Sequence, residues 1–235
     1  MMPESGAIRA VTFDLDFTLW DLEHVIQRAE QRMQRFLAAR YPRVSEHFDE
    51  EAMRRLRLRM AEEHPELRIN VSAMRRASLR RIALTCGYGE DMVEAAFHVF
   101  MEGRHEVVPY DDVAPTLTAL RRHYRIGALT NGNADVNRLA LGEYFDFSVS
   151  AVEVGAAKPS RIIFEAACHR AGIAPGEMVH VGDEVHSDVL GAVRFGMGAV
   201  WLNRRGEPWP EDLERLPHVE LADLSRLPTV LARWR

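Results

Sequence analysis

Short, almost wholly apolar runs recur along the chain between segments with helical periodicity. Each run has the length of a strand and is bounded by Gly, Asn or Asp. The runs are 8–15, 126–129, 147–152, 178–181 and 199–202, with a further short one at 218–221. Apolar strands that alternate with helices are typical of a parallel sheet covered on both faces. The pattern therefore predicts a doubly wound α/β fold with a mainly parallel sheet.

A long helical interruption separates the first strand from the second. Four segments between residues 22 and 103 carry apolar residues at helical spacing, namely 22–40, 45–63, 72–84 and 90–101. The chain would enter this insertion near Trp20 and Asp21 and leave it between Gly103 and Asp112, where we expect Gly103 and Pro109 to break the last helix. We expect residues 21–106 to form a helical cap domain, and residues 1–20 and 107–235 to form the core domain.

Composition and charge are those of an ordinary soluble globular protein. Of 235 residues 47% are hydrophobic and 28% are charged, and the net charge is −5, which argues against wholesale nucleic-acid binding. We find no secretory signal and no apolar run long enough to cross a membrane. Cys86 and Cys168 lack metal-type spacing. We expect a cytoplasmic protein with reduced thiols and no nucleic-acid or membrane partner; monomer and homodimer both stay open.

Arginines gather in the expected insertion. Between residues 54 and 81 there are nine arginines and three glutamates. This excess could attract an anionic substrate or polymer, but solvated helix faces with ion pairs are the commoner cause, and we favour that interpretation.

Two acidic residues end the first strand. Asp14 and Asp16 alternate with Leu15, so their carboxylates would fall on the same side near the carboxyl end of the sheet, where open α/β sheets bind ligands. Asp-x-Asp can also cap a turn. However, two acids appended to a buried strand repel one another unless a cation or a proton offsets them. The pair therefore predicts a metal site or an acid–base pair.

Two further loops carry groups suited to binding an anion. Thr130, Asn131 and Gly132 follow the strand at 126–129, and their hydroxyl and backbone N–H groups can cradle an anion, although Asn-Gly is also a common turn. Lys158, the only lysine among 30 basic residues, precedes Pro159 at the start of an expected helix. A lysine there opposes the helix dipole, which makes sense if an anion lies between the ammonium and the helix end.

The strand at 178–181 leads into the acidic sequence GDEVHSD. Asp183 stands at the end of the strand, Glu184 follows it, and Asp188 falls on the first turn of an expected helix. A hard cation such as Mg²⁺ prefers these oxygen ligands. We expect His180 to be a core histidine, and an oxygen-rich metal shell has no need of His186.

Taken together, these motifs place four kinds of group at one edge of the sheet: a nucleophile-type carboxylate, a hydroxyl, a lysine and metal-type carboxylates. This combination predicts phosphoryl transfer through an aspartyl-phosphate.

The motifs DLDFT, TNG, KP and GDEVHSD, in this order and over nearly the full length, resemble those of the haloacid dehalogenase superfamily. The helical insertion resembles the type I cap of that superfamily. Within it, TNGNA, LGEYFDF and GDEVHSDVLGAVRFGM are similar to bacterial phosphatases that act on flavin mononucleotide and on the phosphorylated riboflavin precursor. The resemblance implies a Rossmann-like core and a Mg²⁺-dependent phosphatase for a small phosphorylated metabolite.

The resemblance also implies roles for individual residues. Asp14 would attack phosphorus, and Asp16 would protonate the leaving alkoxide and then activate water. Asp14 and Asp183 would bind Mg²⁺ through their carboxylates and Asp16 through its carbonyl, while Asp188 would support the metal directly or through water. The groups expected to bind the phosphoryl oxygens are Thr130, the N–H of Asn131, and Lys158.

Other functions on the same fold stay open. True haloacid dehalogenases need no metal and usually have an aromatic residue at the position of Asp16, so an acid there favours phosphate esters. A sugar-phosphate or nucleotide phosphatase, or a phosphomutase, would share the first chemical step. A non-catalytic metal-binding regulator is disfavoured because no motif acid is missing.

Two aromatic residues near the cap entrance are candidates for substrate contact. Phe17 departs from the Gly, Asn or Asp that is frequent at its position, and together with Trp20 it could stack on an isoalloxazine ring. Trp20 could equally pack at the hinge between the domains. Glu184 replaces a commoner small or shorter polar residue, so its role stays open, as does that of His186.

Overall fold

The chain folds into two compact units, each described here by itself. The computed structural model describes residues 7–67 and 69–234; residues 1–6, where we looked for a secretory signal, and the arginine at position 68 lie outside the described residues. One unit consists of Met1–Asp21 and Val108–Arg235, and the other of Leu22–Val107.

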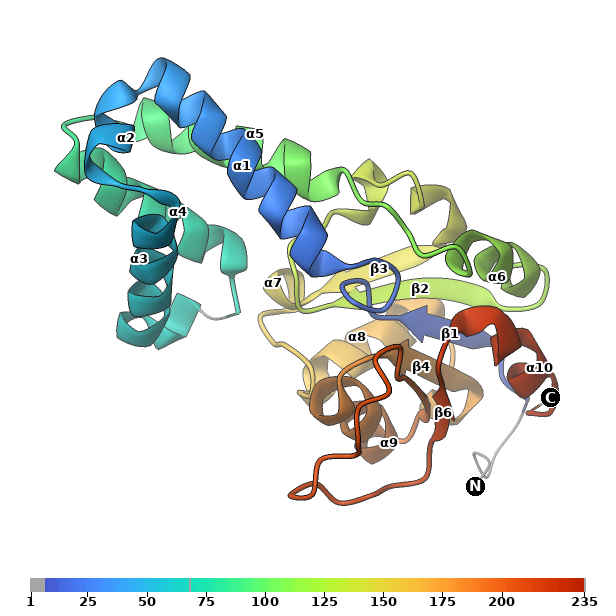
Figure 1. The fold of residues 1–235 in the computed structure, drawn as a ribbon. Helices are drawn as coiled ribbons and strands as arrows, with labels where there is room; N and C mark the ends of the chain where they lie inside the picture. Colours follow the sequence, from blue (N-terminus) through green and yellow to red (C-terminus); the bar gives the residue numbers. More distant parts are fainter. Residues whose placement is uncertain (1–6, 68, 235) are drawn as a thin grey trace. The chain divides into compact units, whose positions relative to one another are not determined.

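A six-stranded parallel sheet forms the centre of the first unit (Figure 1). Its order is β3-β2-β1-β4-β5-β6, and every neighbouring pair is parallel. The strands are β1 (Ala10–Phe13), β2 (Arg125–Thr130), β3 (Phe147–Ser150), β4 (Met178–Gly182), β5 (Gly198–Leu202) and β6 (Val219–Leu221). The chain order reverses beside β1, which is the doubly wound arrangement. The predicted fold class is confirmed.

Helices cover both faces of this sheet (Figure 1). α8 (Arg161–Ala171) and α9 (Gly191–Phe195) share one apolar core with the strands, and α6 (Val113–Leu120) and α10 (Leu227–Ala232) pack together on the other side. The short elements are α7 (Ala151–Val154), a π-helical turn (Val185–Leu190), and 3₁₀ turns at Val136–Arg138, Gly142–Tyr144, Pro175–Glu177 and Leu224–Arg226. Ser160 caps α8 through its side chain, and Gly172 ends the helix with φ 63°.

The second unit is helical. Its helices are α1 (Leu22–Arg40), α2 (Pro42–His47), α3 (Glu50–Glu63), α4 (Val71–Thr85) and α5 (Glu90–His105), with a 3₁₀ turn at Pro65–Leu67. The helix predicted over 45–63 is instead two helices. Phe48 is extended, and the side chain of Asp49 caps α3 by accepting a hydrogen bond from the N–H of Ala52.

Gly103 does not break α5, so that prediction is wrong. The helix continues to His105, and a Cβ at Gly103 would lie 2.8 Å from the Cα of Ala29 on α1. The glycine therefore allows two helices of this unit to approach closely.

Several of the clustered arginines form ion pairs within this unit. Arg80 pairs with the exposed Glu90, whereas Arg57 and Arg75 both contact the buried carboxylate of Glu30. Burial lowers the pKa of Arg75 to about 10, against the opposing effect of Glu30. These glutamate contacts explain the three arginines, so no anionic substrate or polymer is needed to account for them.

Among the described residues, no helix has the length and apolar character needed to cross a membrane. Cys86 and Cys168 are free, buried thiols, and burial raises the pKa of Cys168 to about 11.

Candidate active site

The carboxyl ends of three neighbouring strands bring the predicted chemical groups to one edge of the sheet. β1 lies between β2 and β4. Asp14 follows β1, Thr130 ends β2, and Asp183 follows β4. A backbone hydrogen bond of 2.8 Å from the N–H of Asp14 to the carbonyl of Val181 extends the β1–β4 ladder up to the site.

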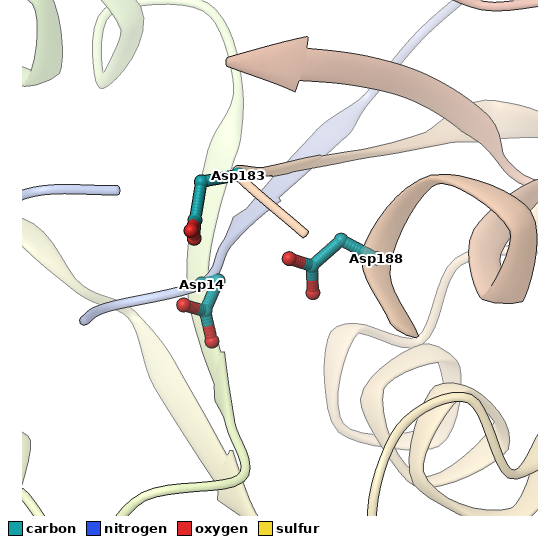
Figure 2. Close-up of side chains that lie close together, drawn as sticks. All are labelled: Asp14, Asp183 and Asp188. Atoms are coloured by element: carbon teal, nitrogen blue, oxygen red, sulfur yellow. The ribbon is translucent and has the colours of Figure 1, made fainter. Parts of the chain in front are cut away.

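Three aspartates form a carboxylate cluster (Figure 2). Asp14, Asp183 and Asp188 each place one carboxylate oxygen within 4.8 Å of those of the other two. Asp14 and Asp188 are buried and Asp183 is half-buried. Figure 2 shows the three side chains lying around a common space. The structure thus brings together the three carboxylates that the sequence assigned to a metal.

The ammonium group of Lys158 lies within this cluster. Its Nζ is 2.6 Å from Oδ1 of Asp14 and 2.7 Å from Oδ1 of Asp188, and it also donates a hydrogen bond of 2.7 Å to the carbonyl of Leu129. Only 1% of the side chain is exposed. Burial opposes the charged form, but the two carboxylates outweigh it and raise the pKa of Lys158. The lysine is therefore a fixed positive charge between two acids.

Asp188 is held from several sides. Nε2 of His180 lies 3.1 Å from its Oδ1, and the N–H of Glu184 donates to its Oδ2 at 3.0 Å. Nδ1 of His180 in turn lies 2.9 Å from Oγ1 of Thr12. His180 is thus a fully partnered core histidine whose contact with Asp188 the sequence did not predict, although its place on β4 next to the site was a signal.

Gly182 gives Asp188 its space. A Cβ at Gly182 would lie 2.3 Å from the Cγ of Asp188, which no real Cβ tolerates. The last residue of β4 must therefore lack a side chain so that the carboxylate of Asp188 can approach.

Asp183 is oriented by two groups that the sequence did not single out. The hydroxyl of Thr18 donates a hydrogen bond of 3.0 Å to its Oδ1, and the indole N–H of Trp201 donates one of 2.9 Å to its backbone carbonyl. Both donors come from other elements of the core unit, so the position of Asp183 is set independently of its own loop.

The pKa values of the three carboxyl groups shift in different directions. Burial raises the pKa of Asp183 to about 6, and the charge of Asp188 adds to that effect. Burial likewise raises the pKa of Asp14, with Lys158 only partly offsetting it. For Asp188 burial is outweighed by Lys158 and His180, which lower its pKa. Crowded carboxylates therefore disfavour ionisation of Asp14 and Asp183 unless further positive charge is present.

Residues 8–196 match the family model described as "Hydrolase: haloacid dehalogenase-like hydrolase". This match covers most of the chain, including all of the motifs that carry the site. The chain belongs to the haloacid dehalogenase-like hydrolases.

Individual relatives in this family carry different names. The chain is 32% identical to 5-amino-6-(5-phospho-D-ribitylamino)uracil phosphatase YigB of Escherichia coli K12, over 96% of this chain and 97% of YigB. It is similar to a solved structure titled 2-haloacid dehalogenase from Pseudomonas syringae pv. Tomato DC3000, with 40% identity, a TM-score of 0.88, and coverage of 97% of this chain and 100% of the other. A phosphatase of the family from Thermococcus onnurineus matches with 26% identity, a TM-score of 0.67, and coverage of 95% and 98%.

In this member of the haloacid dehalogenase-like hydrolases, the loop after β2 is hydrogen-bonded to the loop that carries Lys158. The side chain of Asn131 donates to the carbonyl of Lys158 at 3.1 Å and accepts from its N–H at 2.7 Å. The hydroxyl of Thr130 is buried and accepts a hydrogen bond of 2.9 Å from the N–H of Gly132. The sequence predicted Thr130 and the N–H of Asn131 as phosphate ligands but not this side-chain clamp.

The second acid of the first motif, Asp16, accepts a hydrogen bond from an aromatic side chain. The indole N–H of Trp20 donates a hydrogen bond of 2.9 Å to Oδ1 of Asp16, and the Trp20 ring is fully buried. The buried ring packs within the protein, so it offers no exposed face for stacking on a substrate. Phe17 is half-buried, has φ 60°, and lies 4.7 Å from the guanidinium of Arg205.

The two residues of the metal loop whose roles the sequence left open differ in their surroundings. Glu184 accepts a hydrogen bond of 2.9 Å from the N–H of Ser187 through its side chain, so it caps the π-helical turn. His186 is exposed and lies outside the carboxylate cluster.

The cluster fits a divalent cation bound by oxygen. Three carboxylates and one ammonium leave a net charge of −2 when all are ionised, and carboxylates are the ligands that Mg²⁺ prefers. The oxygens of Asp188 already accept from Lys158 and from the N–H of Glu184. Asp14 and Asp183 are therefore the better placed direct ligands, with Asp188 holding Lys158 beside them.

Proposed function

We propose that this chain is a Mg²⁺-dependent phosphomonoester hydrolase that acts through an aspartyl-phosphate on a small phosphorylated metabolite. The proposal is carried by two acids held in different ways. Asp14 is buried against the ammonium of Lys158, whereas Asp16 is half-buried and held by the indole of Trp20. A carboxylate nucleophile needs positive charge beside it, and a general acid–base needs access to the leaving group and to water.

The two acids would act in sequence. An oxygen of Asp14 attacks phosphorus, the bond to the leaving oxygen breaks, and Asp16 gives its proton to that oxygen. Asp16 then takes a proton from water, whose oxygen attacks phosphorus and releases Asp14. Bound Mg²⁺ would offset charge on the phosphoryl oxygens.

The remaining site residues would bind and orient the phosphoryl group. Lys158 offsets its charge and that of Asp14, and it is held ready by Asp188 and by the side chain of Asn131. The hydroxyl of Thr130 and the N–H of Asn131 would donate to phosphoryl oxygens. Asp14 and Asp183 would hold the metal through their carboxylates, with the carbonyl of Asp16 as a third ligand.

Hydrolysis of a generic aryl phosphate tests this proposal. We expect Mg²⁺-dependent release of phosphate that is abolished by a chelator and in Asp14→Asn. Activity that survived both changes would reject the proposal.

We also propose that the helical unit serves as the type I cap that selects the substrate, and that the protein is cytoplasmic. The domains would be residues 21–106 for the cap, and 1–20 with 107–235 for the core. The expected substrate is flavin mononucleotide or a phosphorylated riboflavin precursor. The name of the E. coli relative, a 5-amino-6-(5-phospho-D-ribitylamino)uracil phosphatase, supports the second of these. A panel of flavin, sugar and nucleoside monophosphates tests this choice. No advantage in kcat/KM for flavin mononucleotide or the riboflavin precursor would reject it.

The similar structure from Pseudomonas syringae supports a second candidate, cleavage of a carbon–halogen bond. Both activities use an aspartate nucleophile, but a halide leaving group needs no proton, so the general-acid role of Asp16 would be unused in that reaction. Parallel assays of phosphate release from an aryl phosphate and of chloride release from 2-chloropropionate separate the two. We expect phosphate release alone.

A further inference from the structure

A cavity of about 380 Å³ lies beside the carboxylate cluster in the core unit. Its wall includes Asp183 and Phe17 and continues along the segment that follows β5, and its apolar part is formed by Val185, Trp201, Leu202, Pro208, Pro210 and Leu213. The volume falls in the range of about 300–1,000 Å³ that small-molecule sites occupy, and Phe17, Tyr110 and Trp201 give the wall aromatic surface beside its polar groups. Every lining residue belongs to the core unit.

Most polar groups of the wall are committed to the protein itself. Asn203 donates a hydrogen bond of 2.7 Å to Oε1 of Glu220. Arg204 pairs with Asp112 at 3.0 Å, and its guanidinium lies 4.1 Å from the ring of Tyr110. These groups fix the wall, because turning toward a ligand would break buried or half-buried contacts.

Arg205 is held differently. It is exposed, and Oε1 of Glu207 lies 3.7 Å from its NH1, a distance at which an exposed ion pair contributes little. Its guanidinium lies 4.7 Å from the centre of the Phe17 ring, inside the cavity wall. Arg205 and Phe17 therefore form a cation–aromatic pair at the end of the cavity where the reacting groups lie.

The backbone of Phe17 is in an unfavourable conformation that places its ring in the cavity wall. Its φ of 60° is in the left-handed region, which glycine, asparagine or aspartate adopts more easily than a bulky residue. Strained residues that persist near reacting groups suggest a use for the side chain. Here the side chain supplies one wall of the cavity and the surface under Arg205.

We infer that this cavity is the subsite for the leaving group and takes a planar heteroaromatic ring, which stacks on the Arg205–Phe17 pair. The inference rests on the proposed function, because it places the phosphate at the carboxylate cluster next to Asp183. A flat, delocalised guanidinium stacks on aromatic faces, whereas the more strongly hydrated ammonium of lysine is poorer at this. Arg205 would thus be a specificity-determining residue of the core unit.

Binding in a chemically inactive background tests the inference directly. The ligands are flavin mononucleotide and ribitol 5-phosphate, which lacks the ring, and both are titrated with Mg²⁺ into Asp14→Asn. We expect flavin mononucleotide to bind more tightly, and Arg205→Ala to reduce the ratio of the two affinities about tenfold. Phe17→Asn should reduce the ratio similarly, because asparagine suits the backbone at this position but lacks the ring.

A second arginine in the same segment gives a matched control. The guanidinium of Arg215 lies 5.6 Å from the ring of Trp209, and Arg215 is not part of the cavity wall. Arg215→Ala should keep the affinity ratio. Equal ratios in the Arg205 and Arg215 variants, or no preference for flavin mononucleotide at all, would overturn the inference.

Hydrolysis assays distinguish a failure of the subsite from a failure of the proposed phosphatase activity. The same variants are measured with Asp14 restored and with both compounds as substrates. Hydrolysis with a selectivity ratio unaffected by Arg205→Ala rejects the subsite and keeps the phosphatase. Absence of hydrolysis of both compounds and of the aryl phosphate, together with a binding ratio that Arg205→Ala lowers, rejects the phosphatase and keeps the cavity as a ring-binding site without a leaving-group role.

Discussion

The indole N–H of Trp20 donates a hydrogen bond of 2.9 Å to Oδ1 of Asp16. The donor cannot turn away easily, because the ring is fully buried and the Trp20 backbone bridges to those of Asp16 and Pro109. One oxygen of the proposed general acid–base is thereby fixed. Trp20 is a positioning residue in this account, which is a more specific role than the hinge packing that the sequence allowed.

Trp20→Phe should slow turnover in a way that depends on the leaving group. A hydrogen bond to a charged group contributes about 1.5–3 kcal/mol, so we expect a loss of about tenfold or more in kcat with an alkyl phosphate. The loss should be smaller with 4-nitrophenyl phosphate, whose leaving group needs no proton. Trp234→Phe is the matched control, because Trp234 follows α10 and belongs neither to the carboxylate cluster nor to the cavity wall. An equal loss with both substrates would contradict the positioning role.

Lys158→Arg should lose most activity even though it keeps the charge. The ammonium has acceptors at 2.6 and 2.7 Å, and only 1% of the side chain is exposed, so the larger planar guanidinium has no room. We expect kcat/KM to fall about 100-fold or more, in line with the loss of one preorganised charge partner, with the far-ultraviolet circular dichroism unchanged. Near-normal turnover would mean that the lone lysine is an accident of composition.

Asp183→Asn should stabilise the protein when a chelator removes divalent cations. A pKa raised to about 6 means that folded Asp183 binds more protons than it does in the unfolded chain between pH 4 and pH 6, so stability falls as the pH rises through that window. An asparagine removes this penalty, worth on the order of 1–3 kcal/mol at neutral pH, and its amide oxygen can keep the hydrogen bond from Thr18. Urea unfolding at pH 7 and pH 4 measures the effect. The gain should shrink at pH 4, and a variant less stable at pH 7 would contradict the expectation.

Gly182→Ala should displace Asp188. The added methyl group would meet the Asp188 carboxylate at 2.3 Å, so either the carboxylate or β4 must move. Overpacking of this kind costs about 1–3 kcal/mol, and Lys158 would lose one of its two acidic partners. We expect weaker Mg²⁺ binding by calorimetry together with a lower free energy of unfolding. Unchanged metal affinity would show that the close approach of Gly182 and Asp188 does not contribute to metal binding.

The sequence predicted the sheet and the motif acids because each rests on a local pattern. β4 and β5 are buried along almost their whole length, so they appear as unbroken apolar runs, and Asp14 and Asp183 follow such runs directly. The helices of the second unit were predicted from the spacing of their apolar residues, except where one capping side chain sets the start of a helix. Asp49 divides one predicted helix in two, and its capping role has no signature in the apolar periodicity.

The groups that hold the motif acids could not be predicted in this way. The contacts from Thr18 and Trp201 to Asp183 join residues on different strands and loops, so they depend on strand register and side-chain rotamers. The close approach of Gly103 to Ala29 likewise depends on how two helices pack. Periodicity identifies which residues face inward but does not indicate which partner each one meets there.

Trapping the covalent intermediate tests whether the carboxylate of Asp14 attacks phosphorus. Asp16→Asn keeps the nucleophile but removes the base that activates water, so the phosphorylated enzyme should accumulate with 4-nitrophenyl phosphate, which needs no general acid. Acid quenching followed by peptide mass spectrometry locates the added phosphoryl group. The account predicts one phosphoryl group on Asp14 that is absent from the Asp14→Asn/Asp16→Asn double variant. A phosphoryl group on another residue, or none while phosphate is still released, would contradict it.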